Sequence, residues 1–316
     1  MREIYSTNLG SAYVGDSLEL LKSIKDNTVN LIITSPPFAL LRKKEYGNKD
    51  EDEYVEWLAQ FGEVAMKKLT HDGSLVIDLG GTYRKGRPVR SIYNYRVLVH
   101  FCDVLGFHLA EEFFWYNPSK LPSPIAWVNK GKIRVKDSVN TIWWFSKSEN
   151  PKANVNNVLV PYSSSMKKLL KNSDKYYQPK ERPSGHNISK NFSIDNGGAI
   201  PSNLLQIANS ESNTKYFKIY REIGGKLGIN SHPARFPKKL PEFFIKFLTN
   251  EEDIVVDIFA GSNTTGEVAE ELGRRWISCE INEEYAAASI FRFTDNAAEA
   301  EKMYVNILSG EKEIIN

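Results

Sequence analysis

Six short apolar runs, each bounded by turn residues, constrain the fold of this 316-residue chain most strongly. Their β-branched and aromatic side chains predict buried strands. The expected strands are Val29–Ser35, Ser74–Leu79, His108–Tyr116, Thr141–Ser146, Ile254–Ala260 and Arg275–Ile281. Helical patterns separate several of these runs, at Glu53–Leu69, Arg96–Leu105, Leu240–Leu248, Thr264–Leu272 and Glu283–Thr294. Strands that alternate with helices indicate an α/β fold with a mostly parallel sheet.

This alternation stops between residues 151 and 231, where Asn, Ser, Lys and Pro are frequent. A structureless loop of that length is uncommon in a compact domain, so we expect a small inserted module with short helices at Ser165–Lys171 and Leu204–Asn209. The whole chain has a net charge of +2, whereas residues 151–246 hold 16 Lys or Arg and only 6 Asp or Glu. This excess indicates either a polyanionic partner or a solvated basic surface.

A glycine turn after the strand that begins at Ile254 is the first candidate binding site. Gly261 permits close approach by a ligand, and Thr264 and Thr265 can cap the next helix, whose amides then point at the bound group. The turn lacks the spacing of a phosphate loop or of a dinucleotide fingerprint. Glu280 ends the following strand, where a carboxylate can bind ribose hydroxyls. Such a turn also occurs without a ligand, but together with Glu280 it favours a nucleoside-containing ligand.

A rigid turn, Ser35-Pro-Pro-Phe38, ends the strand that begins at Val29. The two prolines fix the backbone, so that the Ser35 hydroxyl and the Pro36 carbonyl can both act as acceptors beside the ring of Phe38. This set suits the exocyclic amino group of a nucleobase flipped out of a duplex. The alternative is a plain strand stop with an aromatic plug.

Together, Ser35–Phe38, Phe259–Gly261 and Glu280 resemble the amino-group DNA methyltransferases that use S-adenosylmethionine. With serine at its first position, the catalytic motif resembles that of the cytosine-N4 class. The catalytic motif precedes the cofactor motif here, as in the members of this class that have a permuted motif order. Further stretches that resemble members of this class are Gly15–Leu21, Thr34–Leu40, Arg42–Asn48, Asn117–Ile125, Lys132–Asp137, Asn196–Gly198 and His232–Ile245.

The resemblance implies the S-adenosylmethionine-dependent methyltransferase fold, with a seven-stranded, mostly parallel sheet flanked by helices. A smaller target-recognition module is expected to be inserted into it. Residues 1–150 would then form the catalytic half of the methyltransferase domain, residues 151–231 the recognition module, and residues 232–316 the cofactor-binding half.

The resemblance also implies roles for individual residues. Ser35 and the Pro36 carbonyl would bind the cytosine amino group, Pro37 would hold the turn rigid, and Phe38 would stack on the base. The residues expected to contact the cofactor are Tyr13, Asp16, Thr34, His232, Asp257, Phe259, Ala260, Gly261, Asn263, Thr264, Thr265 and Glu280. The residues expected to contact DNA are Arg42, Lys43, Lys44, Arg182, His186, Asn187 and Lys190, the last four of which could equally belong to a polar loop. The histidines show no metal-ligand spacing, so no metal is expected.

The implied activity is transfer of a methyl group from S-adenosylmethionine to N4 of a flipped cytosine in double-stranded DNA, within the site CAGCTG. Transfer would be direct, without a covalent intermediate, because neither Cys102 nor Cys279 follows a proline as the nucleophile of cytosine-C5 enzymes does. The functional partner would be a cognate restriction endonuclease, and the enzyme a monomer or weak dimer. The chain has no apolar run long enough to span a bilayer and no signal pattern, which predicts a cytoplasmic protein without a membrane partner.

Two other functions stay open at this point. The same scaffold could methylate N6 of adenine, because the motif letters only bias the choice of base. The chain could also be a catalytically silent DNA-binding module.

Overall fold

The computed structural model describes residues 1–38, 53–173, 194–210, 213–229 and 235–315. The chain forms two compact units, of which the larger combines Met1–Ala153 with Asn203–Asn316 and the smaller spans Asn154–Ser202. Among the described residues, no helix combines the length and the apolar character needed to cross a membrane.

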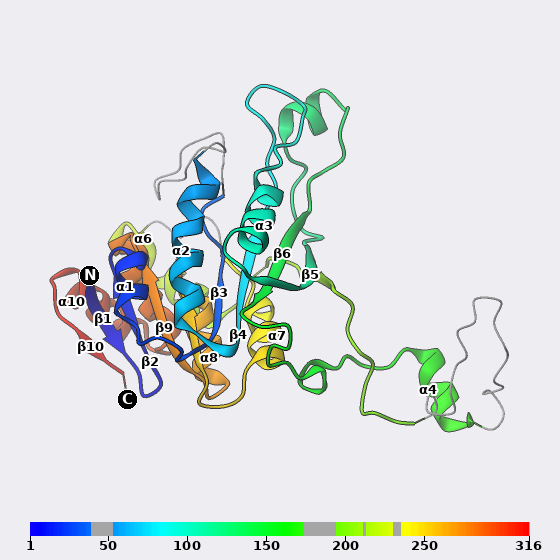
Figure 1. Ribbon diagram of the computed structural model, residues 1–316. Helices are drawn as coiled ribbons and strands as arrows, with labels where there is room; N and C mark the ends of the chain where they lie inside the picture. The colour runs from blue at the N-terminus through cyan, green and yellow to red at the C-terminus, as the bar shows by residue number, and fades with distance from the viewer. Residues whose placement is uncertain (39–52, 174–193, 211–212, 230–234, 316) are drawn as a thin grey trace. The chain divides into compact units, whose positions relative to one another are not determined.

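One sheet forms the centre of the larger unit (Figure 1). Its strands are β1 (Arg2–Ser6), β2 (Gly10–Val14), β3 (Val29–Thr34), β4 (Leu69–Leu79), β5 (His108–Tyr116), β6 (Val139–Ser146), β7 (Leu204–Gln206), β8 (Ile254–Asp257), β9 (Arg275–Glu280) and β10 (Glu313–Ile314). They lie in the order β10-β1-β2-β9-β8-β3-β4-β6-β5-β7. The strands β2, β9, β8, β3, β4, β5 and β7 run in one direction, while β6, β1 and β10 run in the other. The predicted α/β class with a mostly parallel sheet is confirmed.

Helices cover both faces of this sheet. The helices of the larger unit are α1 (Ser17–Ser23), α2 (Tyr54–Lys68), α3 (Tyr93–Asp103), α6 (Lys215–Leu227), α7 (Lys239–Leu248), α8 (Thr264–Glu271), α9 (Glu283–Ala288) and α10 (Ala297–Leu308). Successive strand residues point to opposite faces. In β3, Leu31 and Ile33 therefore join the core beneath α6 to α10, whereas Ile32 joins the core beneath α1, α2 and α3. Figure 1 shows α1, α2 and α3 side by side on one face.

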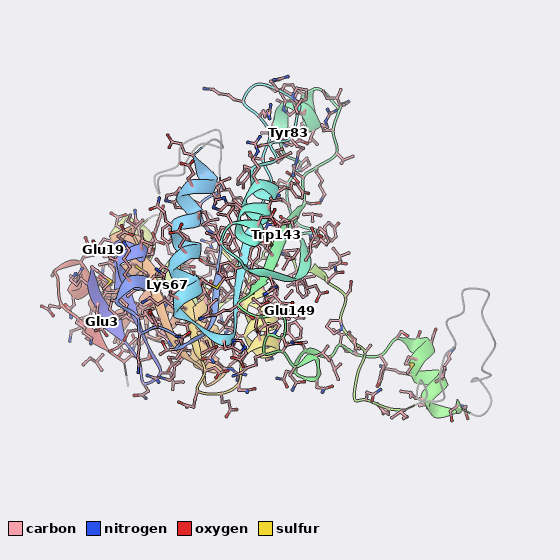
Figure 2. The ribbon with its side chains drawn as sticks, in the orientation of Figure 1. Glu3, Glu19, Lys67, Tyr83, Trp143 and Glu149 are labelled. Carbon is pink, nitrogen blue, oxygen red and sulfur yellow. The ribbon has the colours of Figure 1, made fainter. Side chains whose placement is uncertain are left out.

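Aromatic side chains fill both cores. Phe244 of α7 packs edge-on against Phe113 of β5, with ring centroids 5.1 Å apart. On the other face, Trp143 of β6, labelled in Figure 2, is 1% exposed and lies 6.0 Å from the ring of Tyr95 in α3. Five of the six apolar runs thus bury side chains on both faces, as expected for a sheet covered by two helical layers, whereas β5 is buried only toward its carboxyl end.

The sheet is wider than the seven strands expected. Seven consecutive strands from β2 to β5 form its central part, and β1, β10 and β7 are added at the edges. The helix expected at Leu204–Asn209 was wrong: Leu204–Gln206 is β7, which pairs parallel to β5 because its backbone completes that open edge. A stretch of six residues is too short to distinguish a helix from a strand by periodicity.

The smaller unit is shorter than the expected module 151–231. It contains the helix α4 (Ser164–Lys171) and a short 3₁₀ turn at Val155–Val158. An antiparallel bridge between Val160 and Ala199 holds the incoming and outgoing segments of this unit together, with N···O distances of 2.8 and 2.9 Å. Residues beyond 202 return to the larger unit because Tyr216 and Ile219 of α6 are buried in its core.

Candidate active site

The carboxyl ends of five neighbouring parallel strands meet at one edge of the sheet. β3 and β8 are paired in register, with Leu31 opposite Val255, although more than 200 residues separate them in the chain. The Ser-Pro-Pro-Phe turn follows β3 and the glycine turn follows β8, so the two turns lie next to each other. Both open into one cavity of about 1300 Å³, whose lining includes Phe38 and Gly261. Parallel α/β sheets bind ligands at this edge.

Most of the predicted and described site residues line this cavity: Asp16, Ser35, Pro36, Pro37, Phe38, Asp257, Phe259, Ala260, Gly261, Thr264 and Glu280. Four predicted residues are absent from its lining: Tyr13, Thr34, Asn263 and Thr265. Eight lie outside the described residues: Arg42, Lys43, Lys44, Arg182, His186, Asn187, Lys190 and His232.

Of the four residues absent from the lining, Thr34, Asn263 and Thr265 support the glycine turn through hydrogen bonds. The hydroxyls of Thr34 and Thr265 donate to the two carboxylate oxygens of Asp257, at 2.7 and 2.6 Å. Asn263 caps α8 by accepting from the amide of Gly266 at 3.0 Å. Tyr13 precedes the end of β2 by one residue and is paired with Cys279 instead of Glu280. Contact of these four side chains with the cofactor stays a prediction.

Asp257 forms the base of the glycine turn. Besides the two threonine hydroxyls, its carboxylate accepts from the backbone amide of Phe259 at 3.1 Å. Burial raises the pKa of this carboxyl, and the three hydrogen bonds oppose that shift. A carboxylate inside a buried strand requires hydrogen-bond partners, and two hydroxyls and one amide provide them here.

Glu280 links the glycine turn to the end of β9. One of its carboxylate oxygens accepts from the amide of Gly261 and the other from the amide of Asn282, both at 2.9 Å. Gly261 has a φ of 53°, a left-handed conformation that favours glycine. A carboxylate has about four acceptor positions, so Glu280 keeps acceptor capacity toward the cavity that it lines. Burial raises its pKa.

Asp16 stands at the end of β2, beside Glu280. It is the N-cap of α1 and accepts from the amide of Leu18 at 2.8 Å. The amide of Gly15 donates to the backbone carbonyl of Glu280 at 3.0 Å, which fixes the position of the Asp16 turn relative to β9.

A buried carboxyl group lies behind the catalytic turn, and the sequence analysis missed it. The Ser35 hydroxyl donates to Oδ2 of Asp78 at 3.2 Å, and the side-chain amide of Asn140 donates to Oδ1 at 3.1 Å. Asp78 is the penultimate residue of the buried strand β4 and is 3% exposed. Burial raises its pKa to about 7, against the lowering effect of the bonds from Asn140 and Ser35. Both Asp78 and Asp257 are acids near the end of a buried apolar strand, and glycine follows each of them within four residues. This shared pattern is a sequence signal that could have identified Asp78.

The ring of Phe38 is placed by its neighbours. A Cβ atom added at Gly80 would lie 2.4 Å from Cε2 of Phe38, so the ring packs directly on the glycine backbone. The hydroxyl of Tyr54 donates to the carbonyl of Pro37 at 2.8 Å and fixes the turn from the side of α2. The Ser-Pro-Pro-Phe turn is therefore held on both sides.

The cysteines offer no nucleophile to this cavity. Burial raises the pKa of Cys279 to about 12, and burial also raises the pKa of Cys102. Neither residue is among those that line the cavity. A thiolate mechanism is disfavoured at this site.

Comparisons with known proteins agree with this geometry. Residues 29–291 match the N6/N4 family model described as DNA methylase. The chain is 60% identical to Type II methyltransferase M.PvuII of Proteus hauseri over 99% of this chain and 93% of that protein. It is 27% identical to Type II methyltransferase M.BglII of Bacillus subtilis over 88% of this chain and 67% of that protein.

Solved structures show the same fold. The structure of the PvuII DNA methyltransferase (cytosine-N4-specific) has a TM-score of 0.80 and 52% sequence identity, and the match covers 99% of this chain and 97% of that chain. A DNA modification methylase from Thermus thermophilus is similar in fold alone, with a TM-score of 0.52 and 18% identity over 96% of this chain and 99% of that chain. With the two motif turns in one cavity and residues 29–291 of the chain matched by the family model, this chain belongs to the N6/N4 DNA methylase family.

Proposed function

We propose that this protein transfers a methyl group from S-adenosylmethionine to N4 of cytosine in double-stranded DNA, within CAGCTG. It would be the modification enzyme of a restriction–modification pair. The observation that carries this proposal is the common cavity of the Ser35–Phe38 turn and the Phe259–Gly261 turn. Its volume of about 1300 Å³ exceeds the ~300–1000 Å³ of an ordinary small-molecule site, which leaves room for a cofactor and a base side by side.

The residues on the β8–β9 side fit S-adenosylmethionine. Glu280 retains acceptor capacity for the ribose hydroxyls, and the adjacent Ile281, which lines the cavity and is 66% exposed, offers an apolar surface to the adenine ring. Asp16, Asp257 and Glu280 make this side of the cavity acidic, which favours a cationic sulfonium. When bound, S-adenosylmethionine supplies an electrophilic methyl group.

The residues on the β3–β4 side fit an amino group. The Ser35 hydroxyl and the Pro36 carbonyl accept its two N–H bonds, and the ring of Phe38 covers one face of the base. A cytosine amino group attacks only when its lone pair leaves conjugation with the ring, and these acceptors favour that geometry. The protein's main contribution is thus to position the nucleophile.

The amino nitrogen must also lose a proton after it is methylated. Ser35 already donates to Asp78, so the proton can pass through the Ser35 hydroxyl to that carboxylate. A carboxyl with a pKa of about 7 accepts and releases protons near neutral pH. Asp78 is therefore proposed to receive the proton, while Asn140 keeps its other oxygen in place.

The choice of cytosine N4 over adenine N6 is supported by the relatives. The family model covers both acceptors, whereas the PvuII enzyme, which is 52% identical in its solved structure, is named as cytosine-N4-specific. The site CAGCTG follows from the same resemblance, and target reading is assigned to the basic segment 151–231 that contains the smaller unit. The activity is assigned to the cytoplasm, because its duplex DNA and the companion endonuclease would be there, and a monomer can methylate a palindromic site one strand at a time.

The test is to map N4-methylcytosine in the DNA of cells that express the protein. We expect the inner cytosine of CAGCTG to be modified and the DNA to resist an endonuclease that cuts this site. Ser35→Ala is the matched inactive control. Finding N6-methyladenine in the digested nucleosides would instead establish the adenine activity. Tight DNA binding without methyl transfer would establish the silent DNA-binding module.

A further inference from the structure

Two neighbouring segments, residues 81–92 and 117–138, form a lobe that we call the two-loop lobe (Figure 1). Several of its residues, among them Tyr83 and Ile125, line the cavity. The lobe follows β4 and β5 and belongs to the larger unit. Its base is closed by a hydrogen bond from the amide of Asn117 to the carbonyl of Ser138, at 2.9 Å. Tyr83, labelled in Figure 2, lies in this lobe and is paired with Arg90 in an antiparallel bridge.

The two-loop lobe is strongly positive. Its basic residues are Arg84, Lys85, Arg87, Arg90, Lys120, Lys130, Lys132, Arg134 and Lys136, against the single acid Asp137. The whole chain, by contrast, is almost balanced at +2. These residues precede the basic segment 151–246 in the chain, so this concentration of positive charge is an additional feature.

Some of these cations hold the lobe together. Arg90 forms an ion pair with Asp137, and the guanidinium of Arg134 donates to the carbonyl of Pro88 at 2.7 Å, so both link one loop to the other. Lys136 donates to two backbone carbonyls of its own loop, at 3.2 and 3.3 Å. A further set of cations is exposed at the surface: Lys85, Arg87, Lys130 and Lys132.

Large apolar side chains are exposed on the same lobe. Leu121 is 80% exposed, Val135 is 87% exposed, and Ile125 is 62% exposed while also lining the cavity. Exposed apolar side chains that gather on one surface are typical of a binding site. On a lobe that also carries exposed cations and lines part of the cavity, they suit a partner that offers both phosphates and apolar base surfaces, and this describes a DNA duplex from which one base has been extruded.

We propose that the two-loop lobe is a second DNA-binding surface, which holds the duplex backbone beside the cavity independently of the smaller unit. This inference rests on the proposed function, because the cavity must receive a base of that duplex. The exposed lysines bind phosphates and therefore contribute affinity without sequence preference. Sequence reading stays with the segment 151–231.

The test compares two double variants of the full-length protein. Lys130→Ala/Lys132→Ala removes two exposed cations of the lobe that do not line the cavity. The control variant Lys25→Ala/Lys302→Ala removes one exposed cation from the turn after α1 and one from α10. Its net charge therefore equals that of the lobe variant. Binding of labelled duplexes with and without CAGCTG is measured from about 50 to about 200 mM NaCl, together with S-adenosylmethionine binding and methyl transfer at saturating DNA.

We expect the lobe variant to bind both duplexes more weakly by similar factors. Its slope of log affinity against log salt should be smaller in magnitude by about 1.8, corresponding to two lost phosphate contacts. Cofactor affinity and the transfer rate at saturating DNA should match the wild type. Salt slopes equal to those of the control variant, or a loss confined to the CAGCTG duplex, would overturn the proposal. A wild-type protein that transfers no methyl group in the same samples would instead contradict the proposed function.

Discussion

At the scale of single residues, Asp78 decides how the proposed reaction depends on pH. Its pKa of about 7 means that it is protonated in mild acid and ionised in mild base. Only the ionised form can accept the proton that leaves the amino nitrogen. We therefore expect the methyl-transfer rate at saturating substrates to rise with pH through about 7.

The variant Asp78→Asn tests this assignment. It keeps the size of the side chain but cannot accept the proton, so the transfer rate should fall by about 10²-fold or more. The rise of the rate through pH 7 should disappear, while cofactor affinity stays unchanged. A pH profile that keeps the wild-type shape in this variant would assign the titration to another group.

The same pKa has a consequence for stability. The folded protein holds the Asp78 proton up to about pH 7, whereas the unfolded chain releases it near the ordinary value of 3.8. The folded state binds more protons between these values, so the contribution of Asp78 to the free energy of unfolding falls as the pH rises through this window. Urea unfolding at several pH values should show a smaller fall for Asp78→Asn than for the wild type.

Gly80 offers a separate test of the position of Phe38. Its φ lies outside the left-handed region, so alanine is compatible with the backbone, but the new Cβ would lie 2.4 Å from the Phe38 ring. Gly80→Ala should displace the ring and lower the transfer rate while S-adenosylmethionine binding is retained. The double variant Gly80→Ala/Phe38→Ala separates this effect from others. If Gly80→Ala acts only by displacing the ring that covers the base, the transfer rate of the double variant should be no lower than that of Phe38→Ala alone.

At the scale of elements, the start of α8 determines the shape of the cofactor turn. Asn263 has a φ of 55°, caps the helix through Gly266, and donates to the hydroxyl of Tyr5 at 2.9 Å. A buried network fixes the same turn from below, since Arg292 donates to the carbonyl of Ser262 and to Glu267. The turn is thus held by side chains from β1, α8 and the segment after α9.

Replacement of Asn263 separates these contributions. Asn263→Gly removes the cap but tolerates the left-handed backbone, whereas Asn263→Ala removes the cap and adds strain. We expect both variants to unfold more easily, Asn263→Ala by about 1–2 kcal/mol more than Asn263→Gly. S-adenosylmethionine affinity should fall in the same order, as measured by calorimetry. Equal stabilities of the two variants would show that the turn relaxes to another conformation.

At the scale of the whole molecule, the division into two units separates proposed chemistry from proposed recognition. Within the smaller unit, the bridge between Val160 and Ala199 joins the segment that enters the unit to the segment that returns to the larger one. These residues exchange both backbone hydrogen bonds, so a two-residue Asn-Gly turn can connect them directly.

A variant in which Asn-Gly replaces residues 161–198 should therefore keep the larger unit folded. We expect it to bind S-adenosylmethionine with wild-type affinity and to lose discrimination between CAGCTG and altered duplexes. Circular dichroism and thermal unfolding give the control for folding. Undiminished discrimination by this variant would assign sequence reading to the larger unit.

Several features of the protein could be predicted from its sequence. The six expected strands are all present, because most of their apolar residues are buried and this burial leaves a clear pattern in the sequence, although the first half of β5 is exposed. The two motif turns, Ser35–Phe38 and Phe259–Gly261, were also recognisable, since prolines and a left-handed glycine are required by the backbone itself. The family followed from these motifs and is confirmed by the comparisons.

Other features were decided only by the tertiary structure. β3 and β8 become neighbours through long-range pairing, and no local pattern specifies which strands pair. For the same reason, the roles of Thr34, Thr265 and Asn263 as supports of the turn appeared only when their hydrogen-bond partners were brought close. Asp78 is the clearest case: its pKa depends on burial behind Ser35, and burial is a property of the packed molecule, whereas the conformation of a diproline turn is already present in the chain.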